Sequence, residues 1–155
     1  MHAKPLGSLT AVVAAAAVSL AATPGARAED GAAAKAAYRE GVEHYEAQRF
    51  AEAADAFRRA NEIKPSWKLL YNIGQSEAAA RRYGLALEAF EQYLVEGGDD
   101  VAADRREQVL AEIQRLRVLV GVVDVRAPDG TELLVDGISR GKAPFTGPVR
   151  VAAGA

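Results

Sequence analysis

Apolar residues recur with helical spacing over residues 34–98, and the pattern repeats after an offset of 33 residues. Each stretch places small residues where two helices would cross and bulky residues between those positions. At this offset, the aligned pairs are Gly41 with Gly74, Phe50 with Tyr83, Ala53 with Ala86, and Phe57 with Phe90. The pattern predicts two antiparallel helix pairs with the same internal packing.

Proline and glycine residues divide these helices. Pro65 lacks an N–H group and fixes φ, so we expect a helix to end there and Ser66 to cap the next one. Gly97 and Gly98 are expected to end the second pair, because glycine is the common residue just past a helix.

A further amphipathic helix is expected over residues 100–118, with Asp99 or Asp100 as its cap. Its apolar positions form one stripe, made of Val109, Ile113, Leu116 and Val120. The rest of its surface is charged. One apolar and one polar face is what the capping helix at the end of a helical array requires.

From about residue 120 the pattern changes to that of short strands. Apolar residues alternate around Val123 and Val125, and further strands are expected at 132–135 and 149–152. Two turn sequences separate them, Pro128-Asp129-Gly130 and Asp136-Gly137.

The first 28 residues have the pattern of a secretory signal peptide. Lys4 provides a positive start, residues 6–22 are uncharged and apolar, and residues 23–25 are expected to break any helix. Ala26-Arg27-Ala28 is a small-x-small cleavage site. The alternative is a retained membrane anchor, for which the apolar run is short and rich in alanine. We expect cleavage, and no other stretch of the chain is apolar enough to span a bilayer.

Composition narrows the classes of function. The 155-residue chain is 50% hydrophobic but only 6% aromatic, which indicates a thin core, as in stacked helix pairs. Its formal net charge is −2, and no basic stripe is present, so nucleic acid is not an expected partner. With no cysteine, the chain has no disulfide and no thiolate nucleophile.

No residue pattern points to catalysis or to a cofactor. His44 is the one histidine after the signal segment, so a metal site is not expected and His44 is interpreted as a solvated or packed helix residue. The sequence contains no Gly-x-Ser-x-Gly, phosphate-binding loop or dinucleotide fingerprint. Three pairs of basic residues, Arg58-Arg59, Arg81-Arg82 and Arg105-Arg106, are interpreted as solvated surface rather than a patch for an anionic polymer.

The small and bulky positions of residues 34–98, together with Pro65, resemble the tetratricopeptide repeat family. Tyr93 stands where a small residue is usual, and the second unit lacks a closing proline. In that family the first helix of each unit lines a groove for extended peptides. The resemblance places eight residues there: Lys35, Tyr38, Val42, Tyr45, Lys68, Tyr71, Asn72 and Gln75.

The chemistry of these side chains fits that role. Tyrosines offer flat contact area, Asn72 and Gln75 can bond to a peptide backbone, and Lys68 can meet a carboxylate. Tyr71 and Asn72 are expected to face out of the core. The alternative is that the eight residues only solvate or pack this face.

The C-terminal residues resemble the start of a PEGA domain, a small β-rich module of bacterial envelope and signalling proteins. The matching features are Pro128 with Gly130, Val135-Asp136-Gly137, Gly141 with Pro144, and the Val-x-Val before Gly154. Thr131 stands where the family usually has alanine. The match covers only part of that module. Because a β unit with few paired strands is marginal, we expect the tail after about residue 120 to be less ordered than the helices.

Together these observations predict a mainly α fold. Two helix-turn-helix units of tetratricopeptide type and a capping helix are followed by a short partial β module. The expected organisation is a signal peptide at 1–28, a helical domain at 29–119 and a partial PEGA-like domain at 120–155.

The expected function is that of an exported scaffold or adaptor in the periplasm or cell envelope, which binds a protein or peptide and is not an enzyme. The alternative is an envelope-binding protein, whose β module contacts cell-wall or surface-layer material while the helices act as a spacer. No oligomeric state follows from the sequence.

Overall fold

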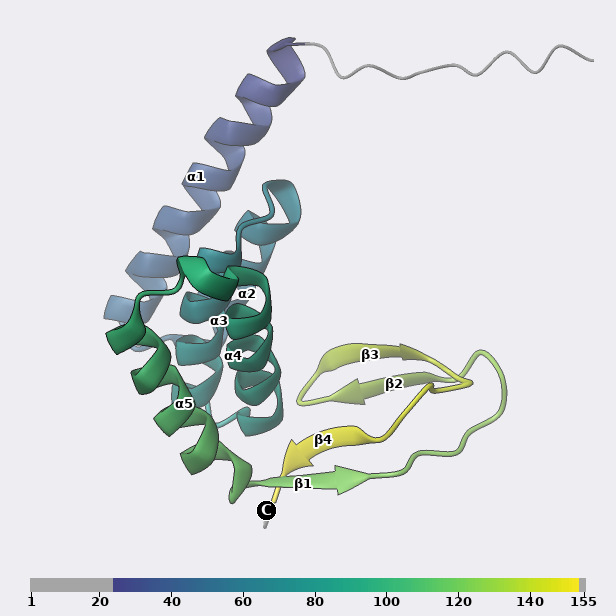
Figure 1. Cartoon of the computed structure of the whole chain (residues 1–155). Helices are drawn as coiled ribbons and strands as arrows, with labels where there is room; N and C mark the ends of the chain where they lie inside the picture. Colours follow the sequence, from purple (N-terminus) through teal and green to yellow (C-terminus); the bar gives the residue numbers. More distant parts are fainter. Residues whose placement is uncertain (1–23, 154–155) are drawn as a thin grey trace, which may run out of the picture.

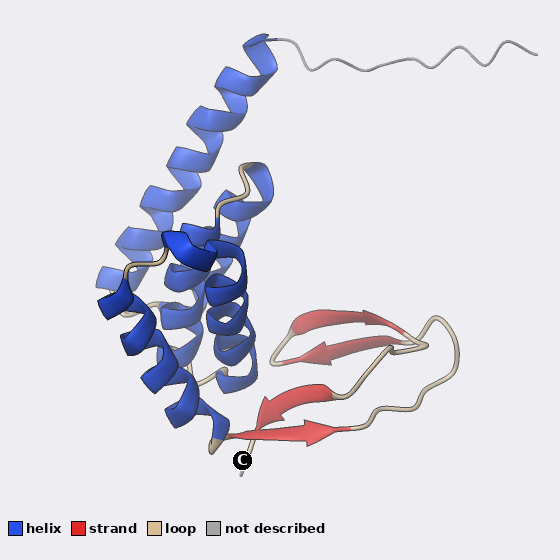
Figure 2. Cartoon of the chain, in the orientation of Figure 1, coloured by secondary structure: helices blue, strands red, loops and turns tan. Residues whose placement is uncertain are grey.

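The computed structural model describes residues 24–153, and the fold is mainly helical with a few short antiparallel strands at its C-terminal end (Figure 2). The helices are α1 (Pro24–Glu46), α2 (Phe50–Ile63), α3 (Trp67–Ala79), α4 (Tyr83–Gly97) and α5 (Ala103–Arg117), with a 3₁₀ turn at Gly98–Asp100. The strands are β1 (Val120–Val123), β2 (Glu132–Val135), β3 (Ile138–Lys142) and β4 (Val149–Ala152).

Most of the expected signal segment, residues 1–23, lies outside the described residues. Its last five residues form the start of α1, so the expectation that residues 23–25 break a helix is wrong at Pro24. Proline is favoured at the first position of a helix, where its missing N–H group leaves no bond unmade.

The helices stack in chain order, α1 against α2, α2 against α3 and α3 against α4, and α5 packs beside α4 (Figure 1). Gly41 and Gly74 allow the close approaches within the two pairs. A Cβ at Gly41 would lie 2.6 Å from the ring of Phe57, and one at Gly74 would lie 2.8 Å from the ring of Phe90. The same contact therefore recurs at the expected offset, with Phe57 and Phe90 both buried in the core.

The turns inside the two pairs also repeat. Gln48 and Arg81, 33 positions apart in the sequence, have φ angles of 59° and 61°. The next residues, Arg49 and Arg82, each donate a backbone N–H at 2.9 Å to the carbonyl oxygen five positions earlier. The 33-residue register is therefore confirmed in the backbone conformation as well as in the packing.

The fifth helix buries Val109, Ile113 and Leu116 of the expected stripe, whereas Val120 lies beyond the helix in β1 and is half-buried. It begins later than expected, at Ala103, and Asp99 and Asp100 belong to the preceding 3₁₀ turn. The prediction that an aspartate caps this helix is wrong, because Ala102 occupies the cap position without a side-chain bond. Val101, which lies between Asp100 and Ala102, is buried and anchors the 3₁₀ turn ahead of the helix.

Ser66 occupies the expected cap position of α3, but its hydroxyl group makes no capping bond. Instead, the side-chain oxygen of Asn61 accepts the backbone N–H of Ser66 at 2.8 Å. The turn between the two pairs is therefore held by a residue of α2 that lies before Pro65.

The strands form two separate two-stranded sheets, β1 with β4 and β2 with β3. The expected strands at 132–135 and 149–152 are confirmed, and the first strand ends at Val123 rather than continuing to Val125. Sequence analysis missed β3. Asp136 and Gly137 have positive φ angles of 53° and 78°, as a tight hairpin turn between β2 and β3 requires.

Ion pairs connect this β module, residues 120–152, to the helices. Arg140 pairs with Glu88 of α4, and Glu91 accepts hydrogen bonds from Arg150 at 2.6 Å and from Arg117 at 3.2 Å. Burial acts to raise the pKa of Glu91, but the two arginines outweigh it, so the pKa lies below its ordinary value. Two arginines of the β module, Arg140 and Arg150, therefore attach it to glutamates on α4.

Candidate peptide-binding groove

Three hollows lie in a row along α1, α3 and α5 and form one groove. The first, of about 640 Å³, lies between α1, the end of α2 and the start of α3, and the second, of about 150 Å³, lies between α1 and α3. The third, of about 350 Å³, extends to α5. Asn72 lines the first and second hollows, while Tyr45 and Gln75 line the second and third, so the three hollows adjoin one another.

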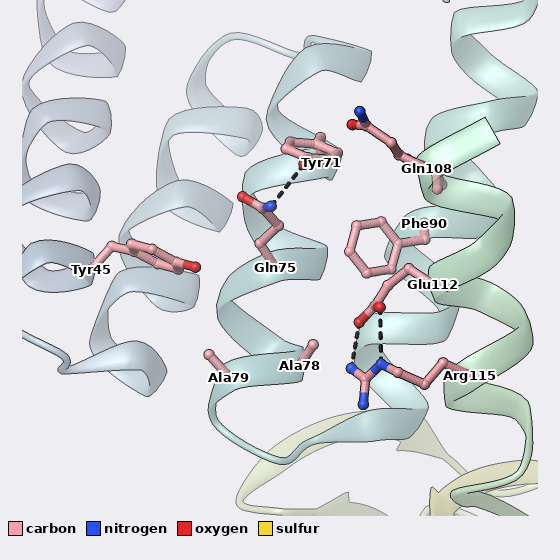
Figure 3. A pocket seen from close by; sticks show the side chains of 10 residues that line it. Tyr45, Tyr71, Gln75, Ala78, Ala79, Phe90, Gln108, Glu112 and Arg115 are labelled. Atoms are coloured by element: carbon pink, nitrogen blue, oxygen red, sulfur yellow. Dashed lines mark hydrogen bonds and ion pairs between the residues drawn. The ribbon is translucent and has the colours of Figure 1, made fainter. Parts of the chain in front are cut away.

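All eight residues that the sequence predicts for this face line the groove. The first hollow contains Lys35, Tyr38, Lys68 and Asn72, and the second contains Val42, Tyr45, Asn72 and Gln75. The third contains Tyr45, Tyr71 and Gln75 (Figure 3). The structure therefore brings together residues that are separated by a full repeat in the sequence.

Tyr71 forms the floor of the third hollow. Its hydroxyl oxygen accepts hydrogen bonds from Gln75 at 2.7 Å and from Arg105 at 2.5 Å. Its ring packs against Phe90 and Tyr93, with centroids 6.0 and 5.6 Å away. The expectation that Tyr71 faces out of the core is therefore wrong: the side chain is half-buried and positions Gln75.

The tyrosines of α1 present the most accessible aromatic surface of the groove. Tyr38 is 41% exposed and Tyr45 is 36% exposed. Each also packs against a ring of α2, Tyr38 against Phe57 at 5.6 Å and Tyr45 against Phe50 at 5.3 Å between centroids. Because these contacts restrict the rings in the free protein, a ligand would order them at little entropic cost.

The fifth helix contributes a wall that the sequence reasoning did not anticipate. Gln108, Glu112 and Arg115 line the third hollow opposite α3 (Figure 3). Arg115 donates two hydrogen bonds to Glu112 and holds the pKa of that carboxyl below its ordinary value. The spacing of these polar residues places them on one helical face, but the helix was interpreted only as a cap.

His44 lies on α1 outside the groove. Its Nδ1 accepts a hydrogen bond from Arg49 at 2.9 Å, and its Nε2 lies 3.5 Å from Glu40. Across residues 24–153, no group of three or more histidine and acidic side chains is arranged to hold a metal ion. His44 is therefore a packed helix residue that bonds to its own neighbours.

The three expected basic pairs do not form one patch. Five of their members bind partners within the chain: Arg58 and Arg82 pair with Glu77, Arg59 with Glu40, Arg105 with Tyr71, and Arg106 with the carbonyl oxygen of Gly98. Glu77 is fully buried, so its two arginines are turned inward rather than solvated. The interpretation of these arginines as plain solvated surface is wrong for Arg58 and Arg82.

Comparison with models of protein families, with curated proteins and with solved structures finds no match for this chain. Within the described residues, no helix is both long enough and apolar enough to cross a bilayer.

Proposed function

We propose that this chain is an exported scaffold or adaptor of the periplasm or cell envelope, which binds an extended segment of another protein in the groove. The observation that supports this most strongly is the row of three adjoining hollows along α1, α3 and α5. The groove combines exposed tyrosine surface with side-chain amides, which are the groups that an extended peptide requires. Its resemblance to a two-unit tetratricopeptide array is consistent with the same role.

Asn72 is the best-placed side chain to bond a peptide backbone. It lines both the first and second hollows, and among the described residues its amide has no hydrogen-bond partner. By contrast, Gln75 already donates to Tyr71. A short groove of two repeats gives a small contact area, so we expect an affinity of around micromolar or weaker unless several copies act together.

Replacing Asn72 with alanine should weaken peptide binding by about two- to tenfold, because one net hydrogen bond is lost. Tyr45→Ala should weaken it further by removing an exposed aromatic contact. The measurement is fluorescence anisotropy with nonapeptides selected from a displayed random library. Gln114→Ala is the matched control, since Gln114 is exposed on α5 and does not line the groove.

Both variants should retain the helix content of the original protein, and Tyr45→Ala should melt slightly lower because its ring packs against Phe50. If the selected peptides bind Asn72→Ala and Tyr45→Ala as tightly as the unchanged chain, the groove is not the binding site. Binding that instead requires intact β strands would favour the envelope-binding alternative.

Export should be accompanied by cleavage after Ala28, giving a mature chain that begins at Glu29. Among the described side chains of α1, the first buried one is Ala34, which lies after the expected cleavage site. Intact mass and N-terminal sequencing of the protein recovered from a bacterial host test this. Ala28→Arg should block processing. For the unchanged chain, an intact Met1 on a membrane-bound product would contradict the predicted cleavage.

A further inference from the structure

The first hollow of the groove is lined by three lysines and by no carboxylate. Lys35 comes from α1, Lys64 follows α2, and Lys68 lies in the first turn of α3. We call this hollow, defined by these three residues, the lysine hollow. Within the part of the chain that the structure describes, none of the three forms an ion pair.

What distinguishes this cluster is that three cations line one hollow that no carboxylate lines. Arg58, Arg59, Arg115, Arg140 and Arg150 each pair with an acidic side chain. The lysine hollow instead gathers three positive charges on a chain whose net charge is −2. Because like charges repel, an anion bound between them would be favoured.

The interior of the lysine hollow is apolar. Ala34, Ala60 and Leu69 line it, and the exposed ring of Tyr38 forms one side. The ammonium group of Lys68 lies 5.5 Å from the centroid of the Trp67 ring. The hollow therefore offers an apolar surface surrounded by positive charge.

We infer that the lysine hollow binds an acidic stretch of the segment that occupies the groove, with carboxylates at the lysines and a neighbouring apolar side chain inside. This inference rests on the proposed function and specifies the chemistry of the partner. Asn72 lines both this hollow and the next one, so a chain anchored by its acidic residues can continue along the groove. A peptide fits better than a flat anionic membrane, because a concave site receives a protruding side chain.

The test uses two fluorescein-labelled nonapeptides that share the sequence Leu-Ala-Ile-Ala-Ser-Leu. One begins with Asp-Glu-Asp and the other with the uncharged Asn-Gln-Asn. The acidic peptide should bind about tenfold more tightly at low ionic strength, since each exposed charge pair contributes modestly. Raising the salt concentration should reduce this preference.

The variant Lys35→Gln/Lys64→Gln/Lys68→Gln should lose the preference, so that it binds the acidic and the uncharged peptide with similar affinity. A control variant, Arg81→Gln/Arg126→Gln/Lys142→Gln, changes the net charge equally at positions outside the groove. It should keep the preference. Gln already occupies the position in the first repeat, Gln48, that corresponds to Arg81, so that turn tolerates the change.

The outcomes separate this inference from the proposed function. If both peptides bind equally and Asn72→Ala weakens both, the acidic partner is excluded while the groove function remains. If vesicles containing an anionic phospholipid bind the unchanged chain but not the lysine variant, and neither peptide binds, an anionic membrane surface is the ligand instead. If neither the peptides nor the vesicles bind, both proposals are overturned.

Discussion

Replacing Glu77 with glutamine is expected to lower the free energy of unfolding by about 3–5 kcal/mol, because it removes one partner of a buried ion pair. The Glu77 side chain is 0% exposed and pairs with Arg58 of α2. One of its oxygens also lies 3.8 Å from Arg82, at the start of α4. Glu77 therefore joins three helices and connects the two helix pairs.

Both arginines depend on this carboxylate. Their side chains are only 25% and 20% exposed, and burial lowers the pKa of the Arg58 guanidinium. Arg58 also pairs with Asp55 at 2.7 Å, but that carboxylate is largely solvated. Without Glu77, two partly buried cations would face each other with too little compensating charge.

Urea denaturation followed by circular dichroism measures this effect. Glu107→Gln is the matched control, because Glu107 is exposed on α5 and should change stability by less than about 0.5 kcal/mol. A triple variant, Arg58→Met/Glu77→Leu/Arg82→Met, should regain much of the lost stability, since it removes the buried carboxylate together with both arginines that pair with it. A loss of less than about 1 kcal/mol for Glu77→Gln would show that the carboxylate is not needed to balance the arginines.

The helical part was predictable because its signals are local and occur twice. The offset that aligns Gly41 with Gly74 also aligns the turns and the groove-facing positions of α1 and α3. Each copy supports the interpretation of the other. For this reason the eight residues that the sequence predicts for the groove all line it, although the sequence could not show that Tyr71 packs against the core.

The contribution of α5 to the groove could not be obtained in the same way. The residues after Gly98 do not continue the 33-residue pattern, and a helix with one apolar face reads equally well as a cap. Only its packing beside α4 brings Gln108 and Arg115 into line with α3. A position defined by contacts between distant segments has no local sequence signal.

Glu77 shows the same limit for the core. A glutamate on a helix normally faces solvent, and His44 occupies the corresponding position in the first repeat. The burial of Glu77 depends on arginines from two other helices. Its charge is accommodated by tertiary contacts that the residue pattern of α3 does not contain.

Gly84→Ala should loosen the β module while leaving the helices stable. The carbonyl oxygen of Arg150 in β4 lies only 2.7 Å from where a Cβ at Gly84 would be, and this contact is with backbone rather than a flexible side-chain tip. The strand must therefore move away from α4, which should also strain the pairing of Arg150 with Glu91. Within α4 itself, alanine is favoured over glycine by about 1 kcal/mol.

Hydrogen exchange can distinguish the expected loosening of the β module from the expected stability of the helices. In the variant, amides of β1 and β4 should exchange at least about tenfold faster, as expected for overpacking that costs about 1–3 kcal/mol. Amides of α2 and α3 should be unchanged or slower. Gly31→Ala is the control, because it makes the same substitution within a helix where no atom lies within 4 Å of the new Cβ. Unchanged exchange in β1 and β4 of Gly84→Ala would show that the close contact with α4 does not hold the β module in place.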